Sequence, residues 1–271
     1  MRARIRILLV AALVLPLAPL GFADGVVIYS AIPNPLPPNV PSLGYEATST
    51  SEFGELIQFA GGGSSYNLRS ATVLMSDWTY ESEWASDING TTITNAGFYE
   101  PITLNLYNVS AGNTVGSLIA SETVDAFIPW RPESGGCADP AAYLASDGNC
   151  YHGSLSEVSF DLTGVNVPGE IIYGLAYNTT DYGADPTGVP GPYDSLNLAL
   201  PTTGNSVGSN PLPDTAYASS GAGGFQQEPG WTPYESGIEF TATPEPSSLL
   251  LLVSGLGALA VRFRRARNSS C

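Results

Sequence analysis

Basic residues are scarce in this chain of 271 residues, and lysine is absent. Of the nine arginines, only Arg69 and Arg131 lie between Asp24 and Ala242, a segment with 24 acidic residues and a formal charge of −22. Proteins that bind nucleic acid neutralise its phosphates with clustered Lys and Arg side chains. The composition therefore argues against nucleic-acid binding and against adhesion to an anionic membrane. It fits contact with neutral sugars, cations or water.

Cysteine and histidine are also rare, which limits the chemistry that the chain can carry. Cys137 and Cys150 enclose a polar, turn-rich stretch, and in an exported protein this pattern favours a disulfide that closes a surface loop. A zinc site with His152 is the alternative, although it leaves a fourth ligand unidentified. Because His152 is the sole histidine, a Ser-His-Asp triad would have to use it, and its neighbours form no nucleophile elbow.

Helix-type periodicity is nearly missing from the middle of the chain, whereas Gly, Pro, Ser, Thr and Asn are abundant. Apolar residues instead alternate with polar ones, as at Ile102, Leu104 and Leu106, and this period of two is typical of strands. We expect an all-β fold: a single β-sandwich over residues 24–242, with a jelly-roll-like arrangement as one form of it. The stretch 204–230 has few large apolar residues and is expected to form long loops. The predicted strands are 26–29, 56–60, 66–78, 102–107, 116–128, 158–162, 171–178, 196–200 and 238–241.

The first 23 residues have the three parts of a secretory signal peptide. Arg2, Arg4 and Arg6 precede an apolar run over 7–15, and small residues stand before a predicted cut between Ala23 and Asp24. An uncleaved N-terminal anchor is the alternative. Prolines at positions 16 and 19 disfavour it, because they would break a long spanning helix.

The last 29 residues, 243–271, combine an extended motif, an apolar run and a basic tail. Pro244-Glu245-Pro246 precedes an uncharged run over 249–261, and a membrane helix is predicted over about 247–261. This run is short for a bilayer, which takes about 20 apolar residues. The arginines that follow it are expected to stop transfer on the cytoplasmic side. A C-terminal amphipathic or core helix is the alternative interpretation of the apolar run. These arginines are Arg262, Arg264, Arg265 and Arg267.

This C-terminal segment resembles the PEP-CTERM sorting signal of Gram-negative bacteria. The resemblance implies recognition by an exosortase, cleavage near the Pro244-Glu245-Pro246 motif, loss of Cys271 with the tail, and a producer of extracellular polysaccharide. The body of the chain is similar to uncharacterised secreted β-domains, and that likeness implies a fold and a location but no activity. It rests on the stretches 32–37, 41–47, 50–54, 102–108 and 173–180.

Two groups of residues are candidates for ligand contact. Trp78, Tyr80 and Trp84 mix with acidic residues, so they could stack on sugar faces. The sequence favours the other interpretation, in which Trp78 is buried at a strand end and Trp84 covers a loop. Four aspartates in turn-rich stretches are candidate calcium ligands, although neither stretch matches an EF-hand loop, and solvated turns are the alternative. These aspartates are Asp139, Asp147, Asp181 and Asp185.

We therefore expect an exported protein that is not an enzyme, passes through the inner membrane and reaches the cell surface or the polysaccharide matrix of a biofilm. A glycan-binding module is the first alternative to a structural role. A secreted glycoside hydrolase is the second alternative. With 24 acidic residues, the sequence cannot single out the carboxylate pair that such an enzyme needs.

Overall fold

The computed structural model of the chain describes residues 25–84, 88, 91–220 and 223–243. Strands dominate these residues and pair in antiparallel sheets, which confirms the all-β prediction. The predicted signal peptide, the Pro244-Glu245-Pro246 motif and the predicted membrane helix lie outside the described residues. Among the helices that are described, none is long and apolar enough to cross a membrane.

The first sheet is built around β4 (Ser65–Asp77), the longest of its strands. Its hydrogen-bonded neighbours follow the order β1-β16-β4-β13-β2, and β10 and β11 also pair with β4. One edge of β4 therefore pairs with β16 and β13, and its other edge pairs with β10 and β11. The other strands of this sheet are β1 (Val26–Ser30), β2 (Ser42–Gly44), β10 (Ser154–Asp161), β11 (Asn166–Pro168), β13 (Leu196–Ala199) and β16 (Ile238–Ala242).

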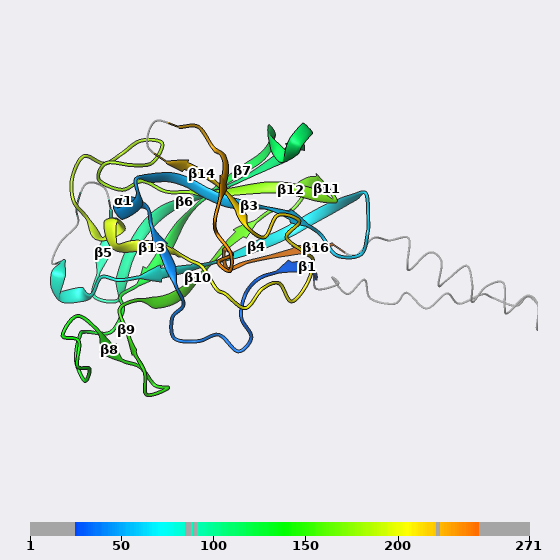
Figure 1. The fold of residues 1–271 in the computed structure, drawn as a ribbon. Helices are drawn as coiled ribbons and strands as arrows, with labels where there is room; N and C mark the ends of the chain where they lie inside the picture. Colours follow the sequence, from blue (N-terminus) through cyan, green and yellow to red (C-terminus); the bar gives the residue numbers. More distant parts are fainter. Residues whose placement is uncertain (1–24, 85–87, 89–90, 221–222, 244–271) are drawn as a thin grey trace, which may run out of the picture.

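The second sheet has the order β15-β14-β3-β12-β6-β5, and β7 also pairs with β6. Its most extensive pairing joins the long strands β6 and β7 into a hairpin (Figure 1). Its strands are β3 (Thr50–Gln58), β5 (Ile93–Thr94), β6 (Gly97–Ser110), β7 (Thr114–Pro129), β12 (Glu170–Ala176), β14 (Thr215–Ser220) and β15 (Gln226–Pro229).

Short elements connect or flank the sheets. The two-stranded hairpin β8–β9 lies apart from both large sheets, and the helices within the described residues are at most four residues long. These elements are α1 (Tyr45–Thr48), η1 (Glu81–Glu83), η2 (Ala111–Asn113), η3 (Pro192–Ser195), β8 (Tyr143–Leu144) and β9 (Cys150–Tyr151).

The two large sheets share one hydrophobic core, as in a β-sandwich. Ile102, Leu104 and Leu106 of β6 are fully buried, as their alternation predicts, and Val158 and Phe160 of β10 are buried too. Aromatic rings from both sheets meet in this core, for example Tyr173 of β12 and Phe240 of β16, whose centroids are 6.0 Å apart. Burial of these rings removes a large apolar area from water, which is the main favourable term in folding.

The stretch 204–230 corrects one prediction. It was expected to form long loops, but it contains β14 and β15, and β14 pairs with β3 inside the second sheet. Ala216, Tyr217 and Ala218 of β14 are buried. Apart from Tyr217, the residues of this strand are small, so its hydrophobic signal is weak in the sequence.

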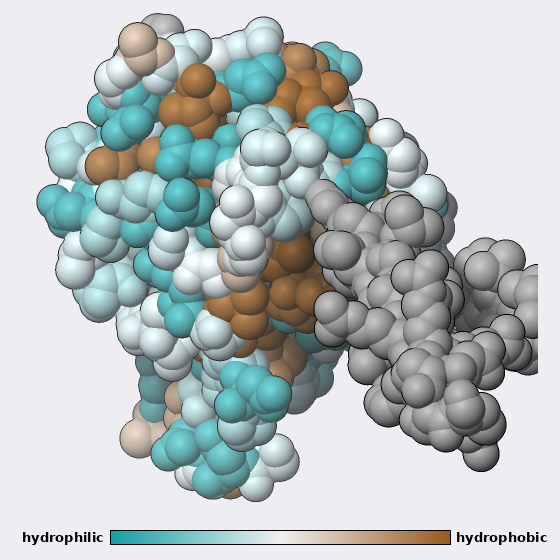
Figure 2. Space-filling model, turned by 90° about the vertical axis from the view of Figure 1, so that its right-hand side faces the viewer, coloured by the Kyte–Doolittle hydropathy of each residue, from teal (hydrophilic) through white to brown (hydrophobic). Residues whose placement is uncertain are grey.

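The two ends of the sandwich contain different elements. Val26 of β1 pairs with Ala242 of β16, so the chain enters and leaves the described region at one place. Figure 1 shows β1 and β16 toward one end of the sandwich, and β5, α1 and the β8–β9 hairpin at the opposite end. We call this opposite end the distal end. Figure 2 looks onto the β1 and β16 end, where apolar side chains gather near the middle of the face.

Candidate functional site: two pockets at the distal end

A buried carboxyl group joins the ends of two strands from different sheets. Asp77, the last residue of β4, is fully buried; its Oδ1 accepts the backbone N–H of Thr79 at 3.2 Å and its Oδ2 accepts that of Arg131 at 3.4 Å. Burial raises the pKa of Asp77 well above its usual value, although these two N–H groups and the Arg131 charge act in the opposite direction. Asp77 thus fixes the segment after β4 against the segment after β7.

The side chain of Arg131 extends this framework. It is nearly buried, and its guanidinium carbon lies 4.6 Å from the centre of the Tyr80 ring, within cation–π range. The cation–π contact holds the Tyr80 ring, and the guanidinium hydrogen bonds hold the loop that follows Arg131. The acceptors are Trp78 O (2.8 Å), Pro132 O (2.8 Å), Ser134 Oγ (3.1 Å) and Ala141 O (3.2 Å).

Arg131 also lines a pocket of about 510 Å³, which we call the aromatic pocket. Trp78 at its edge is 41% exposed, so the expected burial of Trp78 at the end of β4 is wrong. Its ring stacks on the imidazole of His152 with centroids 5.5 Å apart, and His152 Nε2 lies 2.9 Å from Asp139 Oδ2. The pocket is lined by Trp78, Tyr80, Glu83, Arg131, Ser134, Pro140, Ala141 and His152.

The third predicted aromatic contact lies beside this pocket rather than in it. Trp84 Nε1 donates to Thr79 Oγ1 at 2.8 Å, which turns the indole toward a neighbouring hollow that Glu81, Thr94 and Glu133 also line. The structure thus brings Trp78 and Tyr80 into one pocket and places Trp84 next to it.

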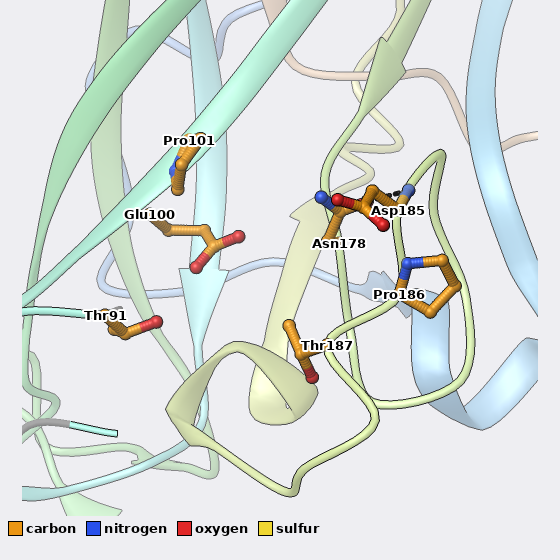
Figure 3. A pocket seen from close by; sticks show the side chains of 7 residues that line it. All are labelled: Thr91, Glu100, Pro101, Asn178, Asp185, Pro186 and Thr187. Atoms are coloured by element: carbon orange, nitrogen blue, oxygen red, sulfur yellow. Dashed lines mark hydrogen bonds between the residues drawn. The ribbon is translucent and has the colours of Figure 1, made fainter. Parts of the chain in front are cut away.

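A second pocket of about 470 Å³ opens between β6 and the loop that follows β12; we call it the acidic pocket. Figure 3 shows Glu100 reaching into it from β6, with Asn178, Asp185 and Thr187 across from it. The Asp185 N–H donates to Asn178 Oδ1 at 3.0 Å, which holds this side of the loop. The lining consists of Thr91, Glu100, Pro101, Asn178, Asp185, Pro186 and Thr187.

Glu100 is the most unusual group in the acidic pocket, because a carboxyl with 3% exposure lines an open cavity. Burial raises its pKa to about 8, and the nearby Asp125 and Asp194 charges add to the rise, while the backbone N–H of Asn178 lowers it. Perturbed carboxyl groups in clefts mark candidate functional sites. The sequence offered no signal for Glu100, since nothing distinguishes it from the other acidic residues.

The helix η3 connects the two pockets. Asp194 of η3 lies near Glu100 and accepts the N–H and the hydroxyl of Thr180 at 2.8 and 2.7 Å. Ser195 of η3 accepts the N–H of Trp78 through its carbonyl oxygen at 3.1 Å. The two pockets therefore share a support and form one rigid end of the sandwich.

The cysteines form the predicted disulfide. Cys137 and Cys150 are bonded, with Cα atoms 6.0 Å apart, and the bridge closes the loop that carries Ala141 of the aromatic pocket. Both thiols are consumed by this bond, so the alternative zinc site would lack two of its ligands. His152, the third residue of that alternative, contacts Trp78 and Asp139 instead.

The four candidate calcium ligands do not converge. Asp139 faces His152, Asp147 accepts the Tyr151 hydroxyl at 2.7 Å, Asp181 donates its N–H to Glu46, and Asp185 lines the acidic pocket. Across the described residues, no three or more His, Cys, Asp or Glu side chains are grouped to hold a metal ion.

A further carboxyl group that the sequence did not mark lies in the interior of the sandwich. Glu55 of β3 accepts the N–H of Ser236 at 2.6 Å and the amide of Asn210 at 3.3 Å. Burial raises its pKa to about 8; the Ser236 bond lowers it and the Glu235 charge raises it. Glu55 does not line either distal pocket, and its bonds hold loops that precede β14 and β16.

No family model, curated protein or solved structure matches this chain. The functional argument therefore rests on the two pockets and on the chemistry of their side chains.

Proposed function

We propose that this chain is an exported protein of the cell surface or the polysaccharide matrix, and that its aromatic pocket binds neutral polysaccharide. The observation that carries the proposal is the exposed Trp78 side chain beside Tyr80 in a pocket with polar walls. An indole face offers flat apolar area to the C–H face of a sugar ring, while Glu83, Ser134 and Arg131 border the site with polar groups.

The rigidity of the pocket supports binding. Arg131 holds Tyr80 and the loop at Ala141, and the His152 ring supports Trp78. Side chains that are already fixed lose less conformational freedom when a ligand binds, and this raises affinity. The strongly negative charge of residues 24–242 favours neutral sugars over acidic ones, because like charges repel.

Sorting is the second part of the proposal. The signal peptide 1–23 directs export, and the sandwich domain 24–242 is carried by the segment 243–271. An exosortase-type enzyme of a Gram-negative bacterium recognises Pro244-Glu245-Pro246 while the predicted helix and the arginine tail hold the chain in the inner membrane. The support is the sequence pattern: prolines keep the motif extended, and an extended peptide suits a protease-like site.

Affinity electrophoresis of the purified full-length chain in native gels tests the binding proposal. Hydroxyethylcellulose or dextran in the gel is expected to retard the wild type, and Trp78→Ala is expected to abolish the retardation. Tyr234→Ala is the matched control, because Tyr234 is also 41% exposed but lies outside the aromatic pocket. If neither polysaccharide retards the wild type, or if the Trp78 variant is retarded equally, the pocket is not a binding site for neutral glycan and a purely structural role is favoured.

A further inference from the structure

The acidic pocket contains negative charge that the chain does not balance. Glu100 and Asp185 line it, Asp125 and Asp194 lie close to Glu100, and the lining contains no basic side chain. Between residues 24 and 242 the chain has only two arginines. Arg131 belongs to the aromatic pocket, and Arg69 lies near Asp161. A counter-charge for this pocket must come from a proton or from a ligand.

The shape of the pocket indicates the size of that ligand. A volume of about 470 Å³ lies within the range of small-molecule sites, about 300–1,000 Å³, and is far more than a single metal ion fills. The lining also contains two prolines, Pro101 and Pro186, whose rings give the walls apolar surface. The other lining groups are the Asn178 amide and the hydroxyls of Thr91 and Thr187. Because the Thr187 hydroxyl is already bonded to Thr179 O and Val189 O, the Asn178 amide and the Thr91 hydroxyl are the groups that suit the hydroxyl groups of a sugar.

We propose that the acidic pocket binds a primary ammonium group carried on a sugar ring, that is, an amino-sugar unit of a polysaccharide. An ammonium group donates three hydrogen bonds, and the carboxyl groups of Glu100 and Asp185 lie on opposite sides of the pocket (Figure 3), where both can accept them once Glu100 has lost its proton. The choice of a sugar as the carrier rests on the proposed function, whereas the positive charge follows from the pocket itself.

Binding of a cation has a second consequence, a proton release. In the empty pocket Glu100 keeps its proton up to a pH of about 8, because burial and the surrounding acidic groups disfavour its charged form. An ammonium group beside it favours the carboxylate. At pH 6.5, where the ligand amine is charged and Glu100 is protonated, binding is therefore expected to release a proton from Glu100 to the solvent.

Isothermal titration calorimetry of the full-length chain at pH 6.5 tests the inference. The probes are glucosamine, N-acetylglucosamine and glucose, which share a ring but differ in the charge on the second carbon, together with calcium chloride. Titrations in two buffers with different ionisation enthalpies measure the proton release. Glucosamine is expected to bind with proton release and at least about tenfold more tightly than the two neutral sugars.

Substitutions in the acidic pocket test whether glucosamine binds there. Glu100→Gln is expected to remove the proton release and to weaken glucosamine binding about tenfold or more. Asp185→Asn, on an exposed loop where folding is not at risk, is expected to weaken binding while the proton release remains. Glu157→Gln is the matched control: it makes the same substitution at an exposed position of β10, outside the acidic pocket, and leaves binding unchanged.

Several outcomes would overturn the inference. In the Trp78→Ala variant, which lacks the proposed neutral-glycan site, equal binding of glucose or N-acetylglucosamine would make the acidic pocket a neutral-sugar site. Calcium binding that the two pocket variants abolish would make it a metal site. Unchanged glucosamine binding in both pocket variants, or no binding to the wild type, would also reject it. Trp78→Ala separates this inference from the proposed function, because it removes retardation by neutral polysaccharide but leaves glucosamine binding intact.

Discussion

Burial controls the charge state of individual carboxyl groups in this protein. Glu55 and Glu100 both have a pKa of about 8, well above the ordinary 4.5, and for both the largest cause is the loss of water around the carboxylate. In the folded protein these groups therefore keep their protons at neutral pH, whereas in the unfolded chain they are ionised. This difference couples the stability of the sandwich to pH.

The stability of the wild type is predicted to fall as the pH rises from about 5 to about 8. In this window the unfolded chain has lost the Glu55 proton and the folded chain has kept it, so the free energy of unfolding declines. Below the window Glu55 is protonated in both the folded and the unfolded chain. Above the window Glu55 is ionised in both, and the decline ends. Glu55→Gln cannot ionise, so it is expected to reduce the decline to the part that Glu100 contributes, and to be more stable than the wild type at pH 8 by a few kcal/mol, as an order of magnitude.

Urea denaturation at pH 5, 6.5 and 8 measures this effect. The substitution also removes an acceptor for Asn210, which costs about 1 kcal/mol at every pH and leaves the slope as the readout. The exposed Glu157→Gln variant is the control and should follow the wild type. An unchanged slope in Glu55→Gln would show that Glu55 ionises normally in the folded protein.

At the residue level, the sequence marked Trp78 and Tyr80, which the structure places in one pocket, but not the groups that position them. Trp78 and Tyr80 were marked because aromatic residues cluster with acids over a few positions. Arg131, which holds Tyr80, is 51 positions away along the chain, and only the pairing of β7 with β6 and the bonds to Asp77 bring it there. Such an arrangement depends on the tertiary fold and has no local pattern.

At the level of elements, the strands with large apolar residues in alternation were predicted well, and β14 and β15 were not. Strand β6 carries its core side chains at every second position, so its pattern is visible in isolation. Strand β14 pairs with β3 and β15, and Tyr217 is the one large apolar side chain that it buries. Its burial follows from its place in the sheet, which the sequence of the strand does not reveal.

The close approach of β3 and β12 leads to a prediction for Gly54. A Cβ atom at this position would lie 1.8 Å from the carbonyl oxygen of Tyr173 and 2.9 Å from Gly174 Cα, so the two strands would have to separate. Gly54→Ala is therefore expected to destabilise the protein by about 3 kcal/mol or more. Gly224→Ala is the control, because no atom lies within 4 Å of its Cβ. Similar melting temperatures for the two variants would contradict the packing.

The β8–β9 hairpin and its disulfide lead to a second prediction at this level. In the chain-entropy model, a bridge that closes about 15 residues contributes about 3 kcal/mol. We expect the double variant Cys137→Ser/Cys150→Ser to keep the sandwich, to be cleaved faster by protease between residues 138 and 149, and to bind polysaccharide more weakly, because the loop carries part of the aromatic pocket. Reduction of the wild type should reproduce these effects. Unchanged retardation in polysaccharide gels would show that the bridge does not support the pocket.

For the whole molecule, the main feature is the separation of the paired strands β1 and β16 from the end that contains β5 and the β8–β9 hairpin (Figure 1), where the residues of the two pockets lie. A segment joined after Thr243 is attached near the β1 and β16 end, so an anchored sandwich would present its pockets away from the point of attachment. This arrangement suits a protein that meets polysaccharide outside the cell while it is still connected to a membrane or a sorting enzyme.

The proposed processing of the tail can be tested in the native host. One epitope tag is placed next to Thr243 and another after Arg267, and the cells are fractionated. If an exosortase-type enzyme cleaves near Pro244-Glu245-Pro246, the first tag is expected at the cell surface or in the matrix, without the second tag and without Cys271. Both tags on one full-length membrane polypeptide at steady state would show that the tail is a permanent anchor.

The pairing of Val26 with Ala242 has a consequence for engineering. Residues that face each other in an antiparallel pair have Cα atoms about 4.5–5.5 Å apart. A host protein would therefore need to open one of its surface turns by only this width to receive the sandwich as an insert, because both junctions would lie side by side. The domain can thus be inserted into another protein through two adjacent junctions at one end. Its two pockets would then lie at the opposite end, away from the host protein.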